Sequence, residues 1–412
     1  MMNKVIIMLS TYKQAKFGAR LAEVLHSMDC KVHFYTIQYS AYMFLKKHGF
    51  DTTIAKKKKV RFEKIHSVKF NDQVEVLSNR MNSDECACLY NVVFADLEQI
   101  EKKQPVDGII IWNGLNVEHR AASNFARQYY KKVLFCEVSN LPGKLFVDKF
   151  GTNAKSEIYN NIQILDRYSD NVAEYNDWRE KYLLYKERQI KVPQAKSRFT
   201  DLSFKVLLDV IGYFFVTHVG YNKKYIFKRF LGLVKNFGNN FQFDNYIYKK
   251  HQDEYVFLPL QVSYDTQVLI NSDVTVDDSI KIAIDRAQKL NKKLVIKPHP
   301  QESDYQVINK LLGLRKNSNF ILVNDNTFEI IKYAYEIITI NSTVGLEAMI
   351  MNKNVKFLGR SFYAKMNGEQ LRKYVMSYLI NIDFFDDSEI SINDVEKLLN
   401  RMEGNIEGSY NC

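Results

Sequence analysis

Two short polar segments, each directly after an apolar run, carry the residue types that bind a phosphate. The first follows residues 294–296 and contains Lys297 and His299, with Pro298 and Pro300 on either side of the histidine. The prolines restrict the loop and hold the lysine and the imidazole near a fixed geometry. A cation and an imidazole there suit a phosphate or a carboxylate. The alternative is a structural loop that carries a surface histidine.

The second segment places Asn341, Ser342 and Thr343 between an apolar run and a helical run that contains Gly345. Ser342 and Thr343 are good helix N-caps, and a helix N-terminus offers free N–H groups and the positive end of its dipole to an anion. Glu347, one turn further, is placed to accept from ribose hydroxyls or to favour the dipole. Capping alone is the alternative. Together, the two segments predict a positive charge at one strand end and a phosphate cradle at a neighbouring one.

Two weaker segments complete the set. Gln261 and Asp265 lie at the start of the second α/β stretch, where they line a cleft or form a hinge or turn. Glu137 and Asp148 lie in a long polar loop after the apolar residues 132–136. Sugar transfer needs a carboxylate, either as a base or as a nucleophile at the anomeric carbon. We expect at least one of the two to be catalytic; otherwise Glu137 caps a helix and Asp148 forms a turn.

Several motifs of other enzyme classes are missing from the sequence. No GxGxxG follows the first apolar run, and neither GxxxxGK[ST] nor GxSxG occurs. Cys86 and Cys88 lack the spacing and partners of a zinc site. Asp386 and Asp387 are adjacent and near the C-terminus, away from the place where a metal-binding DxD is expected. We therefore predict a reaction without a metal or a separate cofactor.

The order of apolar and amphipathic runs predicts the fold that positions these segments. Strand-like and helix-like runs alternate over residues 1–156 and again over 255–385, which is typical of parallel α/β sheets. Such sheets bind ligands at the carboxyl ends of their strands. Residues 157–254 are instead helix-rich and basic, and 386–412 form a C-terminal helix or tail. The sequence predicts two α/β domains that face one another, with a basic helical insertion between them.

Length and composition agree with a globular protein of several domains. The chain has 412 residues, 46% of them hydrophobic and 25% charged, which excludes a disordered chain and a collagen-like fibre. Five cysteines without a regular spacing predict a reducing compartment. No cleavage site follows the apolar N-terminus, and no apolar run is long enough to span a bilayer. These features predict a cytoplasmic protein.

The positive charge is concentrated in two places. Residues 181–250 contain 14 Lys or Arg and 4 Asp or Glu, and residues 46–69 contain 9 and 2. In 225–231 the basic residues flank aromatic and aliphatic ones, which favours a helix lying on an anionic membrane. A solvated helical insertion is the alternative. Nucleic acid is not expected as a partner, because no zinc-finger spacing or RNP-like sequence occurs.

Together, the four segments resemble the capsule polysaccharide biosynthesis proteins of Gram-negative bacteria. The resemblance lies in the stretches KPHP, INSTVGLEA, LQVSYDTQ and the Glu–NLPGK–Asp loop, and it is greatest to single-module β-Kdo transferases that start a capsule lipid linker. Kdo is 3-deoxy-D-manno-oct-2-ulosonic acid. The resemblance implies a GT-B-like α/β fold, with two Rossmann-type domains facing a cleft. It also implies a CMP-Kdo donor and a phosphatidylglycerol or lyso-phosphatidylglycerol acceptor at the inner leaflet. The chain departs from the family at residues 10–13, where relatives have Gly-Pro, and at 138–139.

The resemblance also implies roles for individual residues. The donor phosphate and CMP would be held by Lys297, His299, Ser342, Thr343 and Glu347, with Gln261 and Asp265 beside them. Lys297 and His299 would stabilise the departing CMP as charge develops on it. The family's retention of configuration suits a carboxylate nucleophile, for which Asp148 is preferred over Glu137. A carboxylate would also stabilise the oxocarbenium-like state of the sugar.

The implied partners are a nucleotide-sugar donor, an anionic phospholipid and other capsule assembly proteins. The enzyme would be peripheral at the inner face of the inner membrane, docked by its basic segment. Four alternatives remain at this point: another nucleotide sugar, a glycan-chain acceptor, a UDP-dependent 2-epimerase, and a non-catalytic subunit that binds lipid or polysaccharide.

Overall fold

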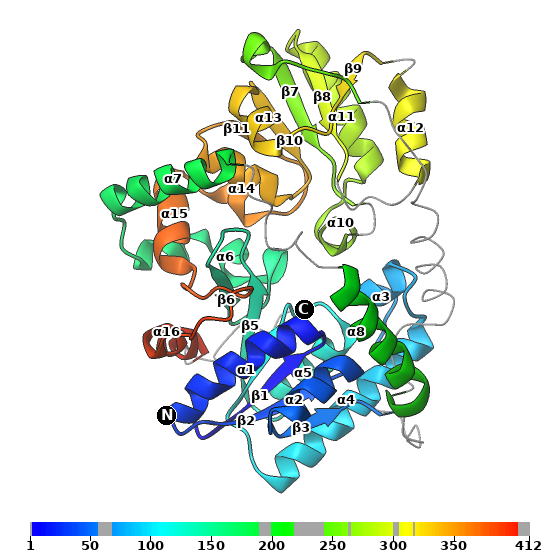
Figure 1. Cartoon of the computed structure of the whole chain (residues 1–412), viewed down its shortest axis with the longest axis vertical. Helices are drawn as coiled ribbons and strands as arrows, with labels where there is room; N and C mark the ends of the chain where they lie inside the picture. Colours follow the sequence, from blue (N-terminus) through cyan, green and yellow to red (C-terminus); the bar gives the residue numbers. More distant parts are fainter. Residues whose placement is uncertain are drawn as a thin grey trace. The chain divides into compact units, whose positions relative to one another are not determined.

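The chain forms two α/β units, each built on its own sheet (Figure 1). The computed structural model describes residues 2–56, 68–188, 199–217, 243–262, 265–299, 305–315 and 318–402. Unit 1 consists of Met1–Asn160, Lys191–Asn222 and Tyr378–Cys412, and unit 2 of Asn161–Ile190 and Lys223–Ser377. The predicted fold class, two Rossmann-type α/β domains, is confirmed.

Unit 1 has a six-stranded sheet in the order β3-β2-β1-β4-β5-β6, parallel except for β6, which runs antiparallel to β5. In β1 the odd residues, such as Ile7, and the even residues, such as Met8, join apolar cores on opposite faces of the sheet. A strand buried on both faces must be apolar throughout, which explains the run KVIIML. The strands are β1 (Lys4–Leu9), β2 (Lys31–Thr36), β3 (Thr52–Ile54), β4 (Gly108–Trp112), β5 (Lys132–Val138) and β6 (Leu145–Asp148).

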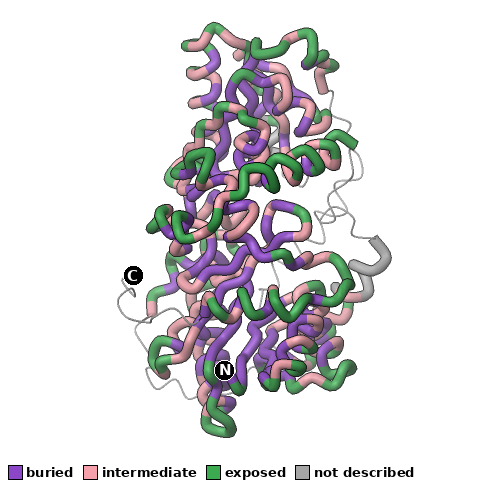
Figure 2. The backbone as a smooth tube through the Cα atoms, turned by 90° about the vertical axis from the view of Figure 1, so that its left-hand side faces the viewer, coloured by how far each residue is buried: buried purple, intermediate pink, exposed green. Residues whose placement is uncertain are grey.

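Helices cover both faces of this sheet. Two of them begin with a capping box: in the first helix, for example, the Thr11 hydroxyl accepts from the Gln14 N–H, and Gln14 Oε1 accepts from the Thr11 N–H. The buried side chains of these helices complete the two cores (Figure 2). The main helices are α1 (Tyr12–Ser27), α2 (Tyr39–Lys47), α3 (Val74–Leu77), α4 (Ser83–Lys103), α5 (Val117–Gln128), α8 (Phe199–Gly212) and α16 (Ile392–Met402).

Unit 2 has a five-stranded, wholly parallel sheet in the order β11-β10-β7-β8-β9. Its strands are β7 (Tyr255–Pro259), β8 (Lys293–Lys297), β9 (Phe320–Leu322), β10 (Glu336–Thr339) and β11 (Asn354–Phe357). The helices include α7 (Val172–Glu187), α10 (Thr266–Asn271), α11 (Val276–Lys289), α12 (Tyr305–Arg315), α13 (Thr327–Tyr333), α14 (Thr343–Ile350) and α15 (Gly368–Lys373).

The C-terminal boundary differs from the prediction. Instead of a second domain to residue 385 and a separate tail, the chain returns to unit 1 at Tyr378. There Leu145 and Ile380 form an isolated antiparallel bridge. Helix α16 buries Val395 and Leu398 in the core of unit 1. Up to Met402, where the described residues end, the predicted tail is therefore a structural part of the first domain.

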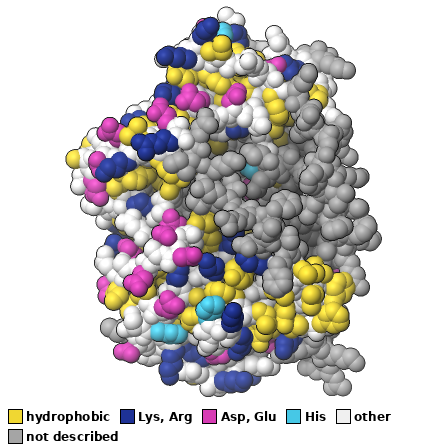
Figure 3. Space-filling model, in the orientation of Figure 1, with side chains coloured by type: hydrophobic (Ala, Val, Ile, Leu, Met, Phe, Trp, Pro, Cys, Tyr) yellow, Lys and Arg dark blue, Asp and Glu magenta, His cyan; other side chains and the backbone are white. Residues whose placement is uncertain are grey.

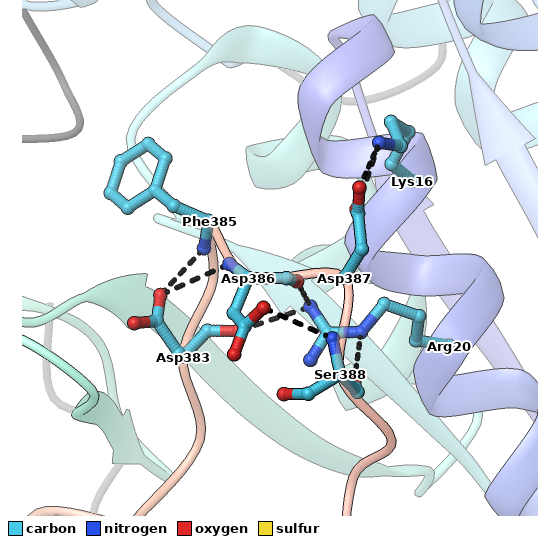
Figure 4. A network of polar contacts seen from close by, with 7 residues as sticks. All are labelled: Lys16, Arg20, Asp383, Phe385, Asp386, Asp387 and Ser388. Atoms are coloured by element: carbon cyan, nitrogen blue, oxygen red, sulfur yellow. Dashed lines mark hydrogen bonds and ion pairs between the residues drawn. The ribbon is translucent and has the colours of Figure 1, made fainter. Parts of the chain in front are cut away.

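Polar contacts fasten this returning segment to α1 (Figure 4). The Arg20 guanidinium donates to the backbone carbonyls of Asp383, Asp386 and Ser388, and Lys16 pairs with Asp387 at 2.8 Å. The adjacent acidic residues at 386 and 387 thus lie at the junction with α1.

The predicted insertion over 157–254 is not one body. Helix α7 belongs to unit 2, whereas α8 belongs to unit 1. The basic and aromatic stretch at 225–231, on which the membrane prediction mainly rested, lies outside the described residues. Among the helices that the structure does describe, none is long and apolar enough to cross a membrane.

Candidate active site

The sheet order of unit 2 defines where a ligand would bind. Strand β7 lies between β10 and β8, and the winding direction reverses between β7 and β10. In open parallel sheets, ligands bind outside the carboxyl ends of the strands at such a switch point. The segments that follow β7, β8 and β10 carry Gln261, Lys297 and Asn341, respectively. All the predicted nucleotide-binding residues lie on these segments or on the helices that follow them.

Gln261 and Asn341 join the two strands at this switch point. The Gln261 amide donates to Asn341 Oδ1 at 3.0 Å, and the Asn341 backbone N–H donates to Gln261 Oε1 at 3.0 Å. Both side chains are buried. The Asn341 amide also donates to the carbonyls of Gln267 and Asn271 in α10. Gln261, predicted to contact the ligand, is thus used to hold the loops together.

Asp265 has a similar internal role. Its carboxylate accepts from the Gln267 N–H at 2.9 Å and caps α10. Asn341 is hydrogen-bonded to the same helix. The cap and the Asn341 contacts therefore fix the position of α10 beside the switch point. Of the two roles considered for Asp265 from the sequence, this contact corresponds to the turn and not to the lining of a cleft.

Helix α14 begins directly at the end of β10. Ser342 is its N-cap, and the hydroxyl accepts from the Val344 N–H at 3.2 Å. Thr343, the first helical residue, is half-buried, and geometry leaves the N–H at this position without an acceptor in its own helix. Gly345 lets the helix approach the sheet, since an added Cβ would lie 2.4 Å from the Phe357 ring. The first turn therefore presents a positive dipole end close to the strand ends.

Lys297 is the last residue of β8 and is half-buried. Its ammonium donates to the Asp325 carbonyl at 2.6 Å and to Thr327 Oγ1 at 2.8 Å. Burial lowers the pKa of Lys297, while the charges of Asp325 and Glu347 act in the opposite direction. The side chain is thus a positioned cation at the edge of the sheet, as predicted. His299 lies two residues further and is also half-buried.

Glu347 has a partner that the sequence did not indicate. Lys186, near the end of α7, donates to Glu347 Oε1 at 2.6 Å, and both side chains are largely buried. Tyr182, one turn earlier on α7, stacks on Trp178 and has a buried hydroxyl without a hydrogen-bond partner in the described part of the chain. Burial raises the pKa of Tyr182, and the charge of Glu347 adds to this effect. Helix α7 therefore closes one side of the α14 segment.

The two candidate carboxylates lie in unit 1, on the β5–β6 hairpin. Glu137 is half-buried near the end of β5. Its two oxygens accept from the side-chain amides of Asn113, at 2.7 Å, and Asn153, at 3.1 Å. Both asparagines have positive φ angles, 66° and 54°, which asparagine tolerates better than most residues. Two dedicated amide donors orient this carboxylate at the carboxyl edge of the sheet.

Asp148, the last residue of β6, is in a different environment. It is 2% exposed and accepts four hydrogen bonds, from the N–H groups of Phe150, Gly151 and Glu157 and from the Tyr378 hydroxyl. Burial raises its pKa, and the hydrogen bonds act against this shift. These contacts tie the loop after β6, the start of the next helix and the returning C-terminal segment to one carboxylate. This is the environment of a structural aspartate.

A third polar cluster lies at the switch point of unit 1, between β1 and β4, and sequence reasoning missed it. Ser10 donates to Glu118 Oε1 at 2.8 Å, and Glu75 accepts from the Val117 N–H at the start of α5. Both glutamates are buried, and burial raises their pKa values. His119 is 1% exposed, and within the described part of the chain neither ring nitrogen has a hydrogen-bond partner, although Glu118 Oε1 lies 3.8 Å from Nε2. Glu75 and Glu118 are far apart in the sequence, and no sequence pattern predicts that they lie close together.

The structure thus places the predicted residues in two groups. Unit 2 brings the nucleotide-binding candidates to one edge of its sheet, where a single lysine and a helix N-terminus suit one phosphate. Unit 1 holds the carboxylates, and Glu137 is the more accessible one. Within the described ranges, no three His, Cys, Asp or Glu side chains meet as they would at a metal site.

Comparisons with known proteins connect this architecture to a family. The family model described as "Capsule polysaccharide biosynthesis protein" matches residues 108–368. Protein FixF of Sinorhizobium fredii is 35% identical over 114 residues, which are 26% of this chain and 27% of that protein, so the match spans about a quarter of that relative.

Two solved structures of Thermosulfurimonas dismutans KpsC are also similar. The β-Kdo 2,7 transferase is 16% identical, with 90% of this chain and 99% of that chain covered and a TM-score of 0.39. The β-Kdo 2,4 transferase is 17% identical, with 73% and 88% covered and a TM-score of 0.44.

Proposed function

Since the chain belongs to the capsule polysaccharide biosynthesis protein family, we propose that it is a glycosyltransferase that moves β-Kdo from CMP-Kdo to a lipid acceptor. The acceptor is of the phosphatidylglycerol or lyso-phosphatidylglycerol type, and the configuration is retained. One observation carries the choice of donor: Lys297 and the N-terminus of α14 occupy the same edge of one sheet, close to the switch point. This pair suits a donor with one phosphate, and a monophosphate leaves no diphosphate for a metal to neutralise.

In the proposed reaction, unit 2 binds CMP and unit 1 acts on the sugar. The phosphate of the donor is bound by Lys297 and the first turn of α14. As the C2–O bond to CMP breaks, negative charge develops on the phosphate, and Lys297 stabilises it. His299 lies on the same loop and is the second candidate for this role. The bound CMP departs as the carboxylate of unit 1 bonds to C2.

Glu137 is the nucleophile in this proposal, in place of Asp148. A nucleophile needs an oxygen that can reach the anomeric carbon, and Asp148 is buried with four donors around it. Glu137 is less buried, and two neutral side-chain amides orient its carboxylate. Attack by Glu137 gives a glycosyl ester. The acceptor hydroxyl then attacks C2 and gives up its proton to solvent, the bond between C2 and Glu137 breaks to return the free carboxylate, and the second inversion restores the original configuration.

A CMP-release assay tests the function directly. Freshly generated CMP-Kdo is incubated with the purified chain, with and without a lyso-phosphatidylglycerol analogue, and CMP is quantified. We expect release that depends on both the acceptor and the enzyme, with Lys297→Met as the inactive control. Release of UDP or GDP from their sugars, without release of CMP from CMP-Kdo, would show that the donor is a different nucleotide sugar. No release from any nucleotide sugar would favour a non-catalytic role.

A further inference from the structure

Helix α8 and the π-helical turn that follows it, η4 (Tyr213–Thr217), have one face held against unit 1. Asp209 Oδ1 accepts from the Ser40 N–H at 2.7 Å, in the first turn of α2. Three residues later, Gly212 lies so close to Tyr39 that an added Cβ would be 2.1 Å from the Tyr39 Cβ. A polar anchor and a close backbone approach therefore fix which side of α8 faces the protein.

The opposite side of the same segment is apolar and exposed. Leu207, Ile211, Phe214 and Phe215 are 53%, 41%, 44% and 80% exposed, respectively. Successive members of this set are three or four residues apart, so they lie in one stripe along the helix. Asp209 and Gly212, which face the protein, lie on the opposite side. Figure 3 shows hydrophobic side chains gathered over this helix at the lower right. On a soluble protein, a contiguous apolar patch of this kind marks a surface that contacts another molecule.

The charges around this stripe indicate what covers it. Helix α2, which packs against α8, has no acidic residue and ends in the exposed Lys46 and Lys47, with Met43 43% exposed one turn earlier. Aromatic and aliphatic side chains next to an excess of cations are complementary to the interface of an anionic bilayer. A second copy of the chain would bring the same positive charges together.

We propose that the outer stripe of α8 and η4 inserts into the interfacial region of an anionic lipid bilayer, with Phe214 and Phe215 deepest. This inference deepens the proposed function, on which it rests for the lipid nature of the acceptor. The residues that contact the membrane are those of the exposed stripe of unit 1. The contact would bring the acceptor-side domain to the surface that contains the acceptor.

Vesicle binding tests this contact without donor or acceptor turnover. The full chain is floated with vesicles of phosphatidylglycerol and phosphatidylcholine, and with phosphatidylcholine vesicles alone. We expect binding to the first, weaker binding to the second, and a reduction in high salt. Phe214→Ser combined with Phe215→Ser should reduce the partition coefficient at least ten-fold. Ile392→Ser, at an exposed isoleucine of the same unit, is the matched control and should leave binding unchanged.

A second measurement reports insertion itself. In Phe215→Trp, the added fluorescence should be quenched by lipids brominated on their acyl chains, whereas that of Ile392→Trp should not. Equal binding of the double serine variant and the parent chain, or absence of quenching at position 215, would overturn the proposal. A parent chain that is a dimer and a double variant that is a monomer would identify the stripe as a self-interface instead. CMP release with a water-soluble acceptor separates a failed membrane contact from a failed enzyme assignment.

Discussion

Gln261 and Asn341 exchange two hydrogen bonds across the switch point of the second sheet, one between their side chains and one from the Asn341 backbone to the Gln261 side chain. They follow β7 and β10, the two strands between which the winding direction reverses. Asn341 directly precedes the N-cap of α14, so the pair sets where this helix begins relative to β7. The phosphate cradle therefore depends on a buried amide network that no ligand needs to touch.

The first prediction concerns this network. Asn341→Ala removes the acceptor of the Gln261 amide and the donor to two carbonyls of α10. Because these groups are buried, we expect the free energy of unfolding to fall by about 3 kcal/mol. Asn341→Asp should be at least as damaging, since its carboxylate would face the carbonyls of Gln267 and Asn271. Urea unfolding of both variants measures this, and an unchanged midpoint for either would contradict the bridging role.

The second prediction concerns Lys297. Among the described residues, its ammonium donates to one carbonyl and one hydroxyl, so Lys297→Met should leave the fold intact. Loss of a positive charge at the leaving phosphate should lower kcat/KM for the donor by about 10²- to 10³-fold. Lys293→Met, at the exposed other end of the same strand, is the matched control and should retain activity. Similar rates for the two variants would remove Lys297 from the site.

The third prediction separates the two carboxylates of unit 1. Glu137→Gln should lower CMP release by about 10³-fold or more, as expected for a nucleophile, with little change in stability. Asp148→Asn should instead destabilise the fold by about 3 kcal/mol, because its amide group would face N–H donors in a buried site. Paired measurements of turnover and thermal unfolding decide between them. A stable, inactive Asp148→Asn would restore Asp148 as the nucleophile.

The fourth prediction tests what Glu347 does. If it binds the ribose, Glu347→Gln should raise the KM for the donor more than Lys186→Met does. If it only pairs with Lys186, the two variants should change the KM equally. Their effects on the free energy of unfolding should then be non-additive, with a coupling energy of about 1 kcal/mol. A double-mutant cycle that measures both KM and the free energy of unfolding distinguishes these cases. The largely buried pair makes the coupling measurable.

The sequence predicts those parts of the site that depend on local order. Lys297, Ser342 and Glu137 each lie at the end of an apolar run, so periodicity was sufficient to place them at strand ends. The partners of these residues could not be predicted in this way. Lys186 is 161 residues from Glu347 along the chain, and only packing of α7 brings the two together.

Two other features had weak local signals. Asn113 is followed by glycine, and both have positive φ, a turn signature that predicts a left-handed loop but not its contact with Glu137. The return of the chain at Tyr378 depends on Leu145, Ile380 and α16 meeting in one core, which is a long-range relationship. A pattern read within one segment contains no information of this kind.

The last prediction concerns His119 and acid stability. Burial without a hydrogen-bond partner lowers its pKa from 6.5 to about 4. Between these values the unfolded chain binds the extra proton and the folded chain does not, so this group's contribution to stability is complete above pH 6.5 and is lost as the pH falls towards 4. The loss amounts to about 3 kcal/mol. Glu75 and Glu118, whose pKa values are raised in the folded state, act in the opposite direction, because they bind protons more readily when folded.

His119→Leu isolates the histidine from these opposing groups. The difference in the free energy of unfolding between the variant and the parent chain should shift by about 3 kcal/mol in favour of the variant as the pH falls from 7 to 4. The two glutamates remain in both proteins and enter this difference only through their interactions with His119, which are the charge of Glu75 and the approach of Glu118 Oε1 to Nε2 at 3.8 Å. Urea unfolding at several pH values provides the measurement. A difference that does not change with pH would mean that His119 keeps an ordinary pKa, and therefore that water or a ligand reaches its ring in solution.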